Sequence, residues 1–290
     1  MSHHLPHRRT ALGALGAGLA GSLALPALAD DASKAKGNIK QSICKWCYPR
    51  IKLETMCAIA KKLGYQSIEL LDPPEILKVK EAGLTCAVVQ GTGINPGLNR
   101  KEHHDRIVKT TLERIEFAAA EKLPNVICMS GNVHDSKRQK IDDETGMNNC
   151  VIGIKRMIGL AEKKKVTLIM EGLNSKVNHE DYMYDRTAWG VELCKRVGSE
   201  SFKLLYDIYH MQIMEGDVIR TIRDNHKYIA HYHTGGNPGR NEIDETQELN
   251  YAAIVKAIIA TGYQGYLGQE FIPKRDAAAS LAQAFRICDV

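Results

Sequence analysis

The 290-residue sequence predicts an α/β protein with a (β/α)₈ TIM barrel fold. From residue 39 onward, short runs rich in β-branched residues alternate strictly with longer segments whose apolar residues recur at helical spacing. Eight such units follow one another, and repeated strand–helix units produce parallel strands joined by right-handed crossovers. Eight units in about 250 residues favour a closed barrel over the alternative, an open doubly wound sheet.

Each expected strand is a short apolar run followed by a segment with helical periodicity. In the third helical segment, Ile107, Leu112, Ile115 and Ala119 recur on one helical face. No linker or low-complexity tract interrupts residues 38–290, which we therefore expect to form a single catalytic domain. We expect strands at 39–47, 67–72, 84–91, 125–131, 166–174, 202–211, 229–236 and 266–271. The helices that follow them are expected at 53–64, 74–83, 103–123, 149–165, 187–198, 217–228, 250–262 and 276–288.

Residues 1–29 have the layout of an export signal peptide. Arg8 and Arg9 precede an apolar stretch rich in Ala, Gly and Leu, and Ala27-Leu28-Ala29 follows as an A-x-A cleavage pattern. The arginine pair resembles a twin-arginine signal, which predicts a periplasmic or otherwise exported protein. A general-secretion signal and a retained helical anchor are the alternatives, although the stretch is short and glycine-rich for a membrane span.

The charge and the cysteines exclude several classes of protein. The formal net charge of +5 falls to +3 without Arg8 and Arg9, and so mild a charge predicts neither a nucleic acid nor a membrane surface as partner. Cys44 and Cys47 form a C-x-x-C motif, but no second motif of this kind completes a zinc site. The motif leaves a disulfide open in an oxidising compartment. We expect Cys57, Cys128 and Cys194, which lie in apolar patterns, to be core thiols.

Side chains able to bind a metal occur at the ends of four successive expected strands. They are Glu171, Asp207, His233 and Glu270, and parallel strands in a barrel bring their C-terminal ends to one rim. Asp207 interrupts an apolar run, where a carboxylate is costly to bury without a partner. We expect that partner to be a divalent ion, Mn, Mg, Co or Zn, held by all four residues. His231 shares the inward face with His233, and we assign the ligand to His233 because it lies nearer the rim.

Two further residues are candidates for binding a substrate. Glu69 ends the second expected strand, where it could hydrogen-bond a ligand or serve only the fold. Arg240 follows the seventh strand in an NPGR loop and could present its guanidinium to a polar substrate. The alternative for Arg240 is an exposed loop residue.

Several motifs resemble the sugar isomerase/epimerase family of xylose isomerase-like barrels, with the hydroxypyruvate isomerase branch as the nearest. The resemblance implies that Glu171, Asp207, His233 and Glu270 are the metal ligands. His233 stands where hydroxypyruvate isomerases often carry Gln, and the imidazole is closer to metal-dependent ketose epimerases. The motifs are EGLN (171–174), YDIYHMQIMEGD (206–217), NPGRNEID (237–244), ELNY (248–251) and GYQGYLGQEFIP (262–273).

The resemblance also implies the reaction. It suggests a metal-dependent aldose–ketose isomerase, similar to hydroxypyruvate isomerase, in which Glu171 and Glu270 move a proton through an ene-diolate. His210 and Arg240 would then contact oxygens of the substrate, a small sugar or hydroxy-keto acid. A ketose 3-epimerase, a sugar dehydratase and a non-catalytic periplasmic sugar-binding protein are the alternatives.

The same scaffold serves zinc endonucleases of abasic DNA. Those enzymes need more metal ligands and a basic face, which this sequence does not offer. We expect no membrane contact after signal cleavage. Family barrels commonly pair through rim helices, so a homo-oligomer stays open.

Overall fold

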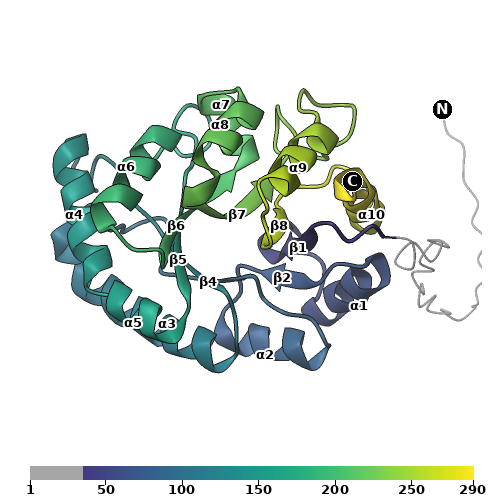
Figure 1. Ribbon diagram of the computed structural model, residues 1–290, viewed down its shortest axis with the longest axis horizontal. Helices are drawn as coiled ribbons and strands as arrows, with labels where there is room; N and C mark the ends of the chain where they lie inside the picture. Colours follow the sequence, from purple (N-terminus) through teal and green to yellow (C-terminus); the bar gives the residue numbers. More distant parts are fainter. Residues whose placement is uncertain (1–34) are drawn as a thin grey trace, which may run out of the picture.

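The computed structural model describes residues 35–290, so the expected signal segment at 1–29 lies outside the described residues and stays a prediction. Within this range, eight parallel strands form a barrel with helices around it (Figure 1), which confirms the predicted (β/α)₈ fold. The sheet order is β2-β1-β8-β7-β6-β5-β4-β3, and two isolated parallel bridges, Ser67 to Thr85 and Leu71 to Val89, complete the ring. The strands are β1 (Lys40–Cys44), β2 (Ser67–Glu69), β3 (Val88–Val89), β4 (Asn125–Cys128), β5 (Thr167–Glu171), β6 (Phe202–Asp207), β7 (Ile229–Thr234) and β8 (Tyr266–Gln269).

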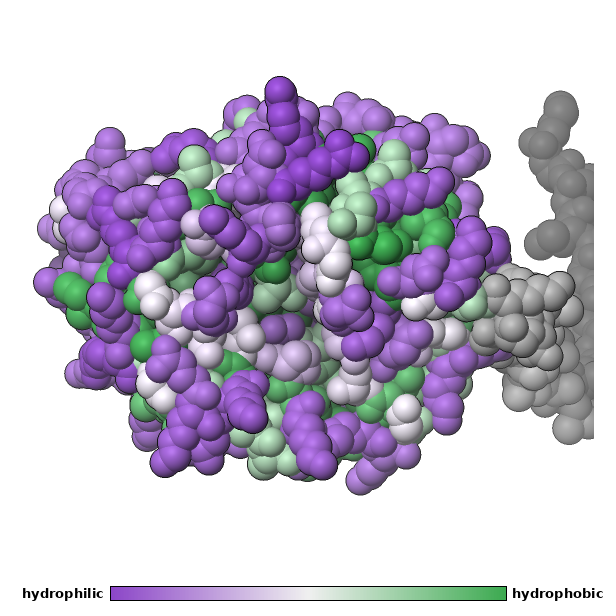
Figure 2. Space-filling view, viewed as in Figure 1, coloured by the Kyte–Doolittle hydropathy of each residue, from purple (hydrophilic) through white to green (hydrophobic). Residues whose placement is uncertain are grey.

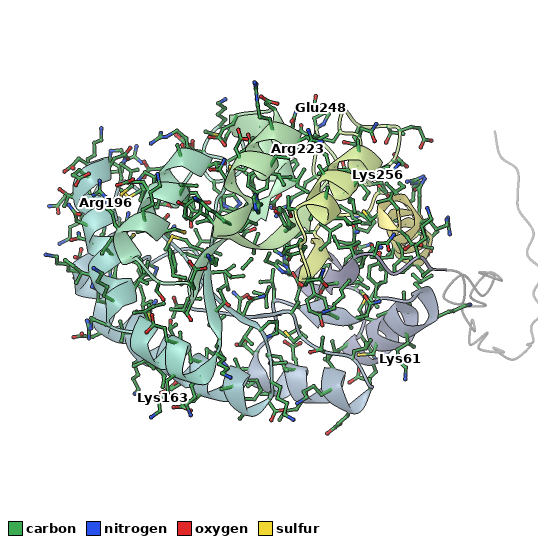
Figure 3. All side chains as sticks on the ribbon, viewed as in Figure 1. Lys61, Lys163, Arg196, Arg223, Glu248 and Lys256 are labelled. Atoms are coloured by element: carbon green, nitrogen blue, oxygen red, sulfur yellow. The ribbon has the colours of Figure 1, made fainter. Side chains whose placement is uncertain are left out.

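The helices enclose the strands and turn their charged side chains outward. Figure 3 labels examples on the outside of the barrel, and Figure 2 shows mainly hydrophilic residues at the outline of the molecule. No helix in residues 35–290 is long and apolar enough to cross a membrane. The α-helices are α1 (Leu53–Leu63), α2 (Pro73–Glu81), α3 (His104–Ala120), α4 (Asp143–Lys155), α5 (Ile158–Lys164), α6 (Thr187–Val197), α7 (Ile208–Met214), α8 (Val218–Asn225), α9 (Tyr251–Ala260) and α10 (Ala277–Cys288). Short 3₁₀ segments are η2 (Lys45–Cys47), η3 (Lys101–His103) and η4 (His226–Tyr228).

The expected strand at 202–211 is shorter than predicted. It ends at Asp207, whose Oδ1 accepts a hydrogen bond from the backbone N of His210 at 3.2 Å and so caps α7. His210 therefore lies on the first turn of a helix. The expected helix at 149–165 also differs, because it divides between α4 and α5 and begins earlier, where Asp142 Oδ1 accepts from Thr145 N at 2.9 Å.

The inside of the barrel is half apolar and half polar. On β3 to β6, inward side chains form a small apolar cluster, whereas on β1 and β2 Ser42 donates to Ser67 Oγ at 2.8 Å. Strand alternation places the next inward residue two positions further along, at the C-terminal rim. The strand alternation that builds the core therefore also determines which residues point inward at the C-terminal rim. The apolar cluster consists of Ala87, Val88, Ile127, Met129, Ile169 and Leu205.

The loops after β3 and β4 cross at two glycines. A Cβ on Gly97 would lie 2.2 Å from the backbone N of Gly131, and Gly131 itself has a φ of +93°. Next to the crossing, Asn99 N donates to Ser130 O at 2.8 Å and Leu98 N to Met129 O at 3.0 Å. Only a residue without a side chain lets the two backbones approach so closely.

We expect the substitution Gly97→Ala to lower the free energy of unfolding by about 1–3 kcal/mol, because the added methyl group overlaps fixed backbone atoms. Denaturant unfolding of the full chain followed by circular dichroism would measure this change. Gly159→Ala is the matched control, since a Cβ there meets nothing within 4 Å and alanine suits α5 better than glycine. Equal stability of the two variants would show that the glycine crossing is dispensable.

Candidate metal centre

Four polar side chains from β5 to β8 converge at the C-terminal rim of the barrel. Glu171, Asp207, His233 and Glu270 each offer a ligand atom, and these four atoms lie within 4.8 Å of one another. His233 Nδ1 is 3.2 Å from Glu171 Oε1 and 2.9 Å from Glu270 Oε2. The parallel register places Asp207 directly beside His233. None of the four is more than 4% exposed, so the cluster lies in a desolvated setting.

The cluster contains more negative charge than its protein partners neutralise. Arg240 Nη2 lies 2.5 Å from Glu270 Oε2 and 3.3 Å from Asp207 Oδ2, so its guanidinium pairs with two of the three carboxylates. Burial raises the pKa of Asp207 well above its usual value, and burial together with the charge of Glu270 raises the pKa of Glu171. A divalent cation would supply the missing positive charge. Three carboxylates and one imidazole are a donor set that fits such an ion.

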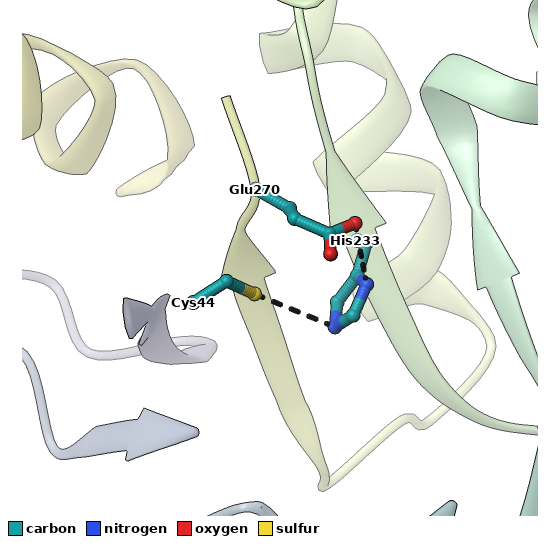
Figure 4. A group of neighbouring side chains, drawn as sticks. All are labelled: Cys44, His233 and Glu270. Atoms are coloured by element: carbon teal, nitrogen blue, oxygen red, sulfur yellow. Dashed lines mark hydrogen bonds and ion pairs between the residues drawn. The ribbon is translucent and has the colours of Figure 1, made fainter. Parts of the chain in front are cut away.

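His233 is held on both edges of its ring. Burial alone would lower its pKa, but the neighbouring carboxylate of Glu270 helps to raise it well above the usual value. On the opposite edge, Nε2 lies 2.7 Å from Glu69 Oε1 and 3.6 Å from the thiol of Cys44. Figure 4 shows His233 between Cys44 and Glu270. The imidazole thus lies between the carboxylates of Glu171 and Glu270 on one edge and an inner polar group, Glu69 and Cys44, on the other.

Glu69 belongs to that inner group. It has no exposed surface, and its Oε1 is hydrogen-bonded to Nε2 of His231 at 2.8 Å as well as to His233. The two imidazoles occupy Oε1, and Oε2, which has no hydrogen-bond partner among the described residues, is buried below the mouth of the site. Direct substrate binding by Glu69 therefore stays a prediction that this arrangement does not favour. His231 is fully buried and is bonded to Glu69 through Nε2, while its Nδ1 has no hydrogen-bond partner among the described residues.

His210 presents a free hydrogen-bond donor beside the cluster. Its Nδ1 accepts from the backbone N of Asn174 at 3.1 Å, so the ring proton lies on Nε2. Burial and the charge of Arg240 lower the pKa of His210 well below its usual value, which keeps the ring neutral. Within residues 35–290, Nε2 has no hydrogen-bond partner and lies 3.6 Å from Asp207 Oδ2. A ligand oxygen next to Asp207 could accept this proton.

Trp46 is a site residue that the sequence reasoning missed. Its indole Nε1 donates to Glu270 Oε1 at 2.7 Å, and the guanidinium of Arg240 lies 5.0 Å from the ring centre. The indole is 44% exposed, so it forms part of the mouth of the site. Sequence reasoning left the surrounding C-x-x-C open as a disulfide, but Cys44 and Cys47 are both buried free thiols. The place of Trp46 at the C-terminal end of the first expected strand, 39–47, was the signal that could have found it.

A cavity of about 920 Å³ lies nearby, between the loops that follow β3, β4 and β5. Asn99, His134, Arg138 and Glu180 are among its lining residues, and none of the four converging ligand residues lines it. His134 Nδ1 and Asp181 Oδ1 are already paired there at 2.7 Å. We place the chemistry at the rim cluster, because convergent ligand atoms and shifted pKa values mark functional sites more strongly than open volume does.

Known proteins share both the sequence pattern and the fold. The chain is 34% identical over 121 residues to the 2-oxo-tetronate isomerase of Cupriavidus necator, which covers 42% of this chain and 46% of that protein. It is also 34% identical over 122 residues to the hydroxypyruvate isomerase of Escherichia coli, which covers 41% of this chain and 45% of that protein. The solved structure of 3-keto-D-glucoside 4-epimerase from E. coli has the same fold, with a TM-score of 0.70 and 18% identity over 87% of this chain and 99% of that one.

The family model described as a xylose isomerase-like TIM barrel matches residues 57–288, which is most of the chain. This match confirms the resemblance that the strand-end motifs predicted. The chain belongs to the xylose isomerase-like TIM barrel family.

Proposed function

We propose that this chain is a metal-dependent isomerase that moves a carbonyl group between adjacent carbons of a small sugar or hydroxy-keto acid. The observation that carries the proposal is the convergence of Glu171, Asp207, His233 and Glu270 on one buried point at the rim. Relatives whose names specify isomerases of hydroxypyruvate and 2-oxo-tetronate support this class of enzyme and substrate. We propose the same four residues as the ligands of the ion.

The reaction requires removal of a proton from the carbon next to a carbonyl. A divalent ion at this point would polarise the carbonyl and stabilise the negative charge that develops. The two glutamates differ in their environments, which suits them to different roles. Burial and Glu270 raise the pKa of Glu171, so it is a stronger base than an ordinary glutamate. Burial opposes ionisation of Glu270, but Arg240 and His233 outweigh this effect and hold its pKa well below the usual value.

These environments support Glu171 as the base of the first proton transfer. Glu270 stays ionised through its contacts with Arg240 and Trp46 and faces the same point from β8. We propose that Glu171 removes the proton and, once protonated, either returns it to the substrate or passes it through solvent to Glu270, which then delivers a proton from the other side. Return at the neighbouring carbon gives an isomerase.

We propose that His210 binds an oxygen of the substrate and that Arg240, which pairs with Asp207 and Glu270, supports substrate binding from beside them. The neutral Nε2–H of His210 would donate to an oxygen on which negative charge develops. Arg240 is held between the rings of Trp46 and Tyr209, with its guanidinium 5.0 Å and 5.4 Å from the two ring centres. A rigidly held guanidinium keeps the carboxylates in place without a change of geometry during the reaction.

A ketose epimerase is the second candidate. The observation that favours it is the imidazole of His233 among three carboxylates, which resembles the ligand set of metal-dependent ketose epimerases, and the 3-keto-D-glucoside 4-epimerase shares the fold. In an epimerase the proton would return to the carbon that lost it, from the opposite face. Reaction in D₂O distinguishes the two, because deuterium appears at the neighbouring carbon after isomerisation and at the original carbon after epimerisation.

We expect the purified protein to bind one equivalent of Mn²⁺ or Co²⁺ and to lose its activity when a chelator removes the ion. Asp207→Asn should abolish this binding, because it removes one of three charged ligands. Isothermal titration of chelator-treated protein would measure the stoichiometry. Asp142→Asn is the matched control, since Asp142 only caps α4. Full activity after complete removal of metal would refute the metal-dependent reaction.

We expect Glu171→Gln and Glu270→Gln each to lower kcat by about 10²–10⁴-fold, the usual contribution of a general acid or base. The assay is a screen of hydroxypyruvate, 2-oxo-tetronate and ketoses with added Mn²⁺ or Co²⁺, followed by kinetics on the best substrate. Glu248→Gln, which changes a side chain paired with Gln212 away from the centre, should keep the activity of the native chain. Near-normal turnover in both site variants, with the fold intact, would rule out the glutamate pair.

The substitution His210→Gln should lower kcat by about 10²–10³-fold, as loss of a donor to a developing oxyanion usually does. The change in KM should be much smaller, because the bond strengthens only as charge develops. Steady-state kinetics would separate the two parameters. A large rise in KM with kcat unchanged would instead assign His210 to ordinary substrate binding.

A further inference from the structure

The two nitrogens of His233 face two different carboxylate groups. Nδ1 points to Glu171 and Glu270, at 3.2 Å and 2.9 Å, and Nε2 points to Glu69 at 2.7 Å. An imidazole that donates its Nε2 proton to Glu69 has its lone pair on Nδ1, which is the atom that faces the other ligands. When an ion displaces the proton on Nδ1, the contact with Glu69 would therefore select the tautomer that can bind that ion.

Glu69 is itself fixed in place. Its Oε1 also accepts from His231 Nε2 at 2.8 Å, and the thiol of Cys44 lies 3.5 Å from the same oxygen. The pairing of β1 with β2 sets Cys44 beside Glu69 in the register. Because Glu69 and His231 are completely buried, no water or ligand from the mouth can replace these bonds without rearrangement.

The neighbouring strand leaves room for this contact. Gly268 on β8 pairs with His233 in the register, and a Cβ on Gly268 would lie 2.5 Å from Glu69 Oε1 and 2.8 Å from His233 Cδ2. Any side chain at this position would push the carboxylate and the imidazole apart. The glycine is a second observation, independent of the hydrogen bonds, that the barrel is built around the contact between Glu69 and His233.

We infer that Glu69 is a positioning residue that orients His233 and raises the basicity of its Nδ1 toward the ion. This inference rests on the proposed function, because it assumes a divalent ion at the rim cluster. Carboxylates that accept the second ring proton of a metal-binding histidine commonly change metal affinity by about 10–100-fold. Glu69 would act through His233 and would not touch the substrate.

The test is the affinity for Mn²⁺, measured by titration of chelator-treated full-length protein. Glu69→Gln keeps a carbonyl oxygen for both imidazoles but removes the charge, and it should weaken Mn²⁺ binding by about 10–100-fold. The absorption bands of bound Co²⁺ should shift as well, because the donor strength of the imidazole changes. Glu242→Gln is the matched control: it removes a buried carboxylate that binds Arg275 and Ser280 away from the centre, and it should leave Mn²⁺ affinity unchanged.

A double-mutant cycle separates positioning from general stability. In a His233→Gln background, Glu69→Gln should change Mn²⁺ affinity much less, because the imidazole through which Glu69 acts is gone. An equal loss in both backgrounds, or no loss in the native background, would overturn the role of Glu69 alone. Failure of the native protein to bind Mn²⁺ would overturn this inference together with the proposed function. Should Glu69→Gln not fold, Glu69→Asp keeps the charge, withdraws the carboxylate from Nε2 and should weaken binding in the same assay.

Discussion

The burial of negative charge at one end of the barrel is the constraint on which the rest of the structure depends. Glu171, Asp207 and Glu270 lie almost without solvent contact within a few ångströms of one another. A buried carboxylate without compensation is costly, so this rim is stable only if cations or hydrogen-bond donors meet it. Arg240 compensates part of this buried negative charge. The pKa values of Glu171 and Asp207 are still raised, which is consistent with incomplete compensation. The proposed divalent ion would satisfy the electrostatics and the chemistry at once.

The barrel delivers these charges through a simple geometric rule. Parallel strands end at one rim, and alternate residues of each strand point inward. Ile169 and Leu205 fill the apolar interior, and the next inward residues on the same strands are Glu171 and Asp207. The fold and the site therefore use one periodicity, so the core that stabilises the barrel also sets the spacing of the ligands.

The sequence predicted the fold, and it also singled out the four residues that converge at the rim, because these signals are local. Asp207 stands out because a carboxylate interrupts an apolar run. His233 differs from His231 because His233 lies two residues nearer the C-terminal rim. The place of Glu69 could not be predicted in the same way, since its contact with His233 depends on distances across the barrel that no spacing encodes. The end of β6 was misplaced because the sequence does not show that Asp207 turns its side chain back to cap a helix.

Trp46 was missed for a different reason. The C-x-x-C motif around it has a well-known chemical meaning, and that meaning drew attention to the thiols and away from the indole between them. Position in the fold was the better guide, because a residue directly after a barrel strand lies at the active rim whatever motif contains it.

The double use of Asp207 has a consequence for how this chain can diverge. One carboxylate starts α7, sets the position of His210 through that helix and faces the proposed ion. Asparagine could keep the helix cap but not the charge, and a residue without a side-chain acceptor would lose both, so only aspartate serves the local architecture and the proposed chemistry together. Evolution of a new specificity on this scaffold would therefore be expected to proceed through the surrounding loops and to leave this aspartate unchanged.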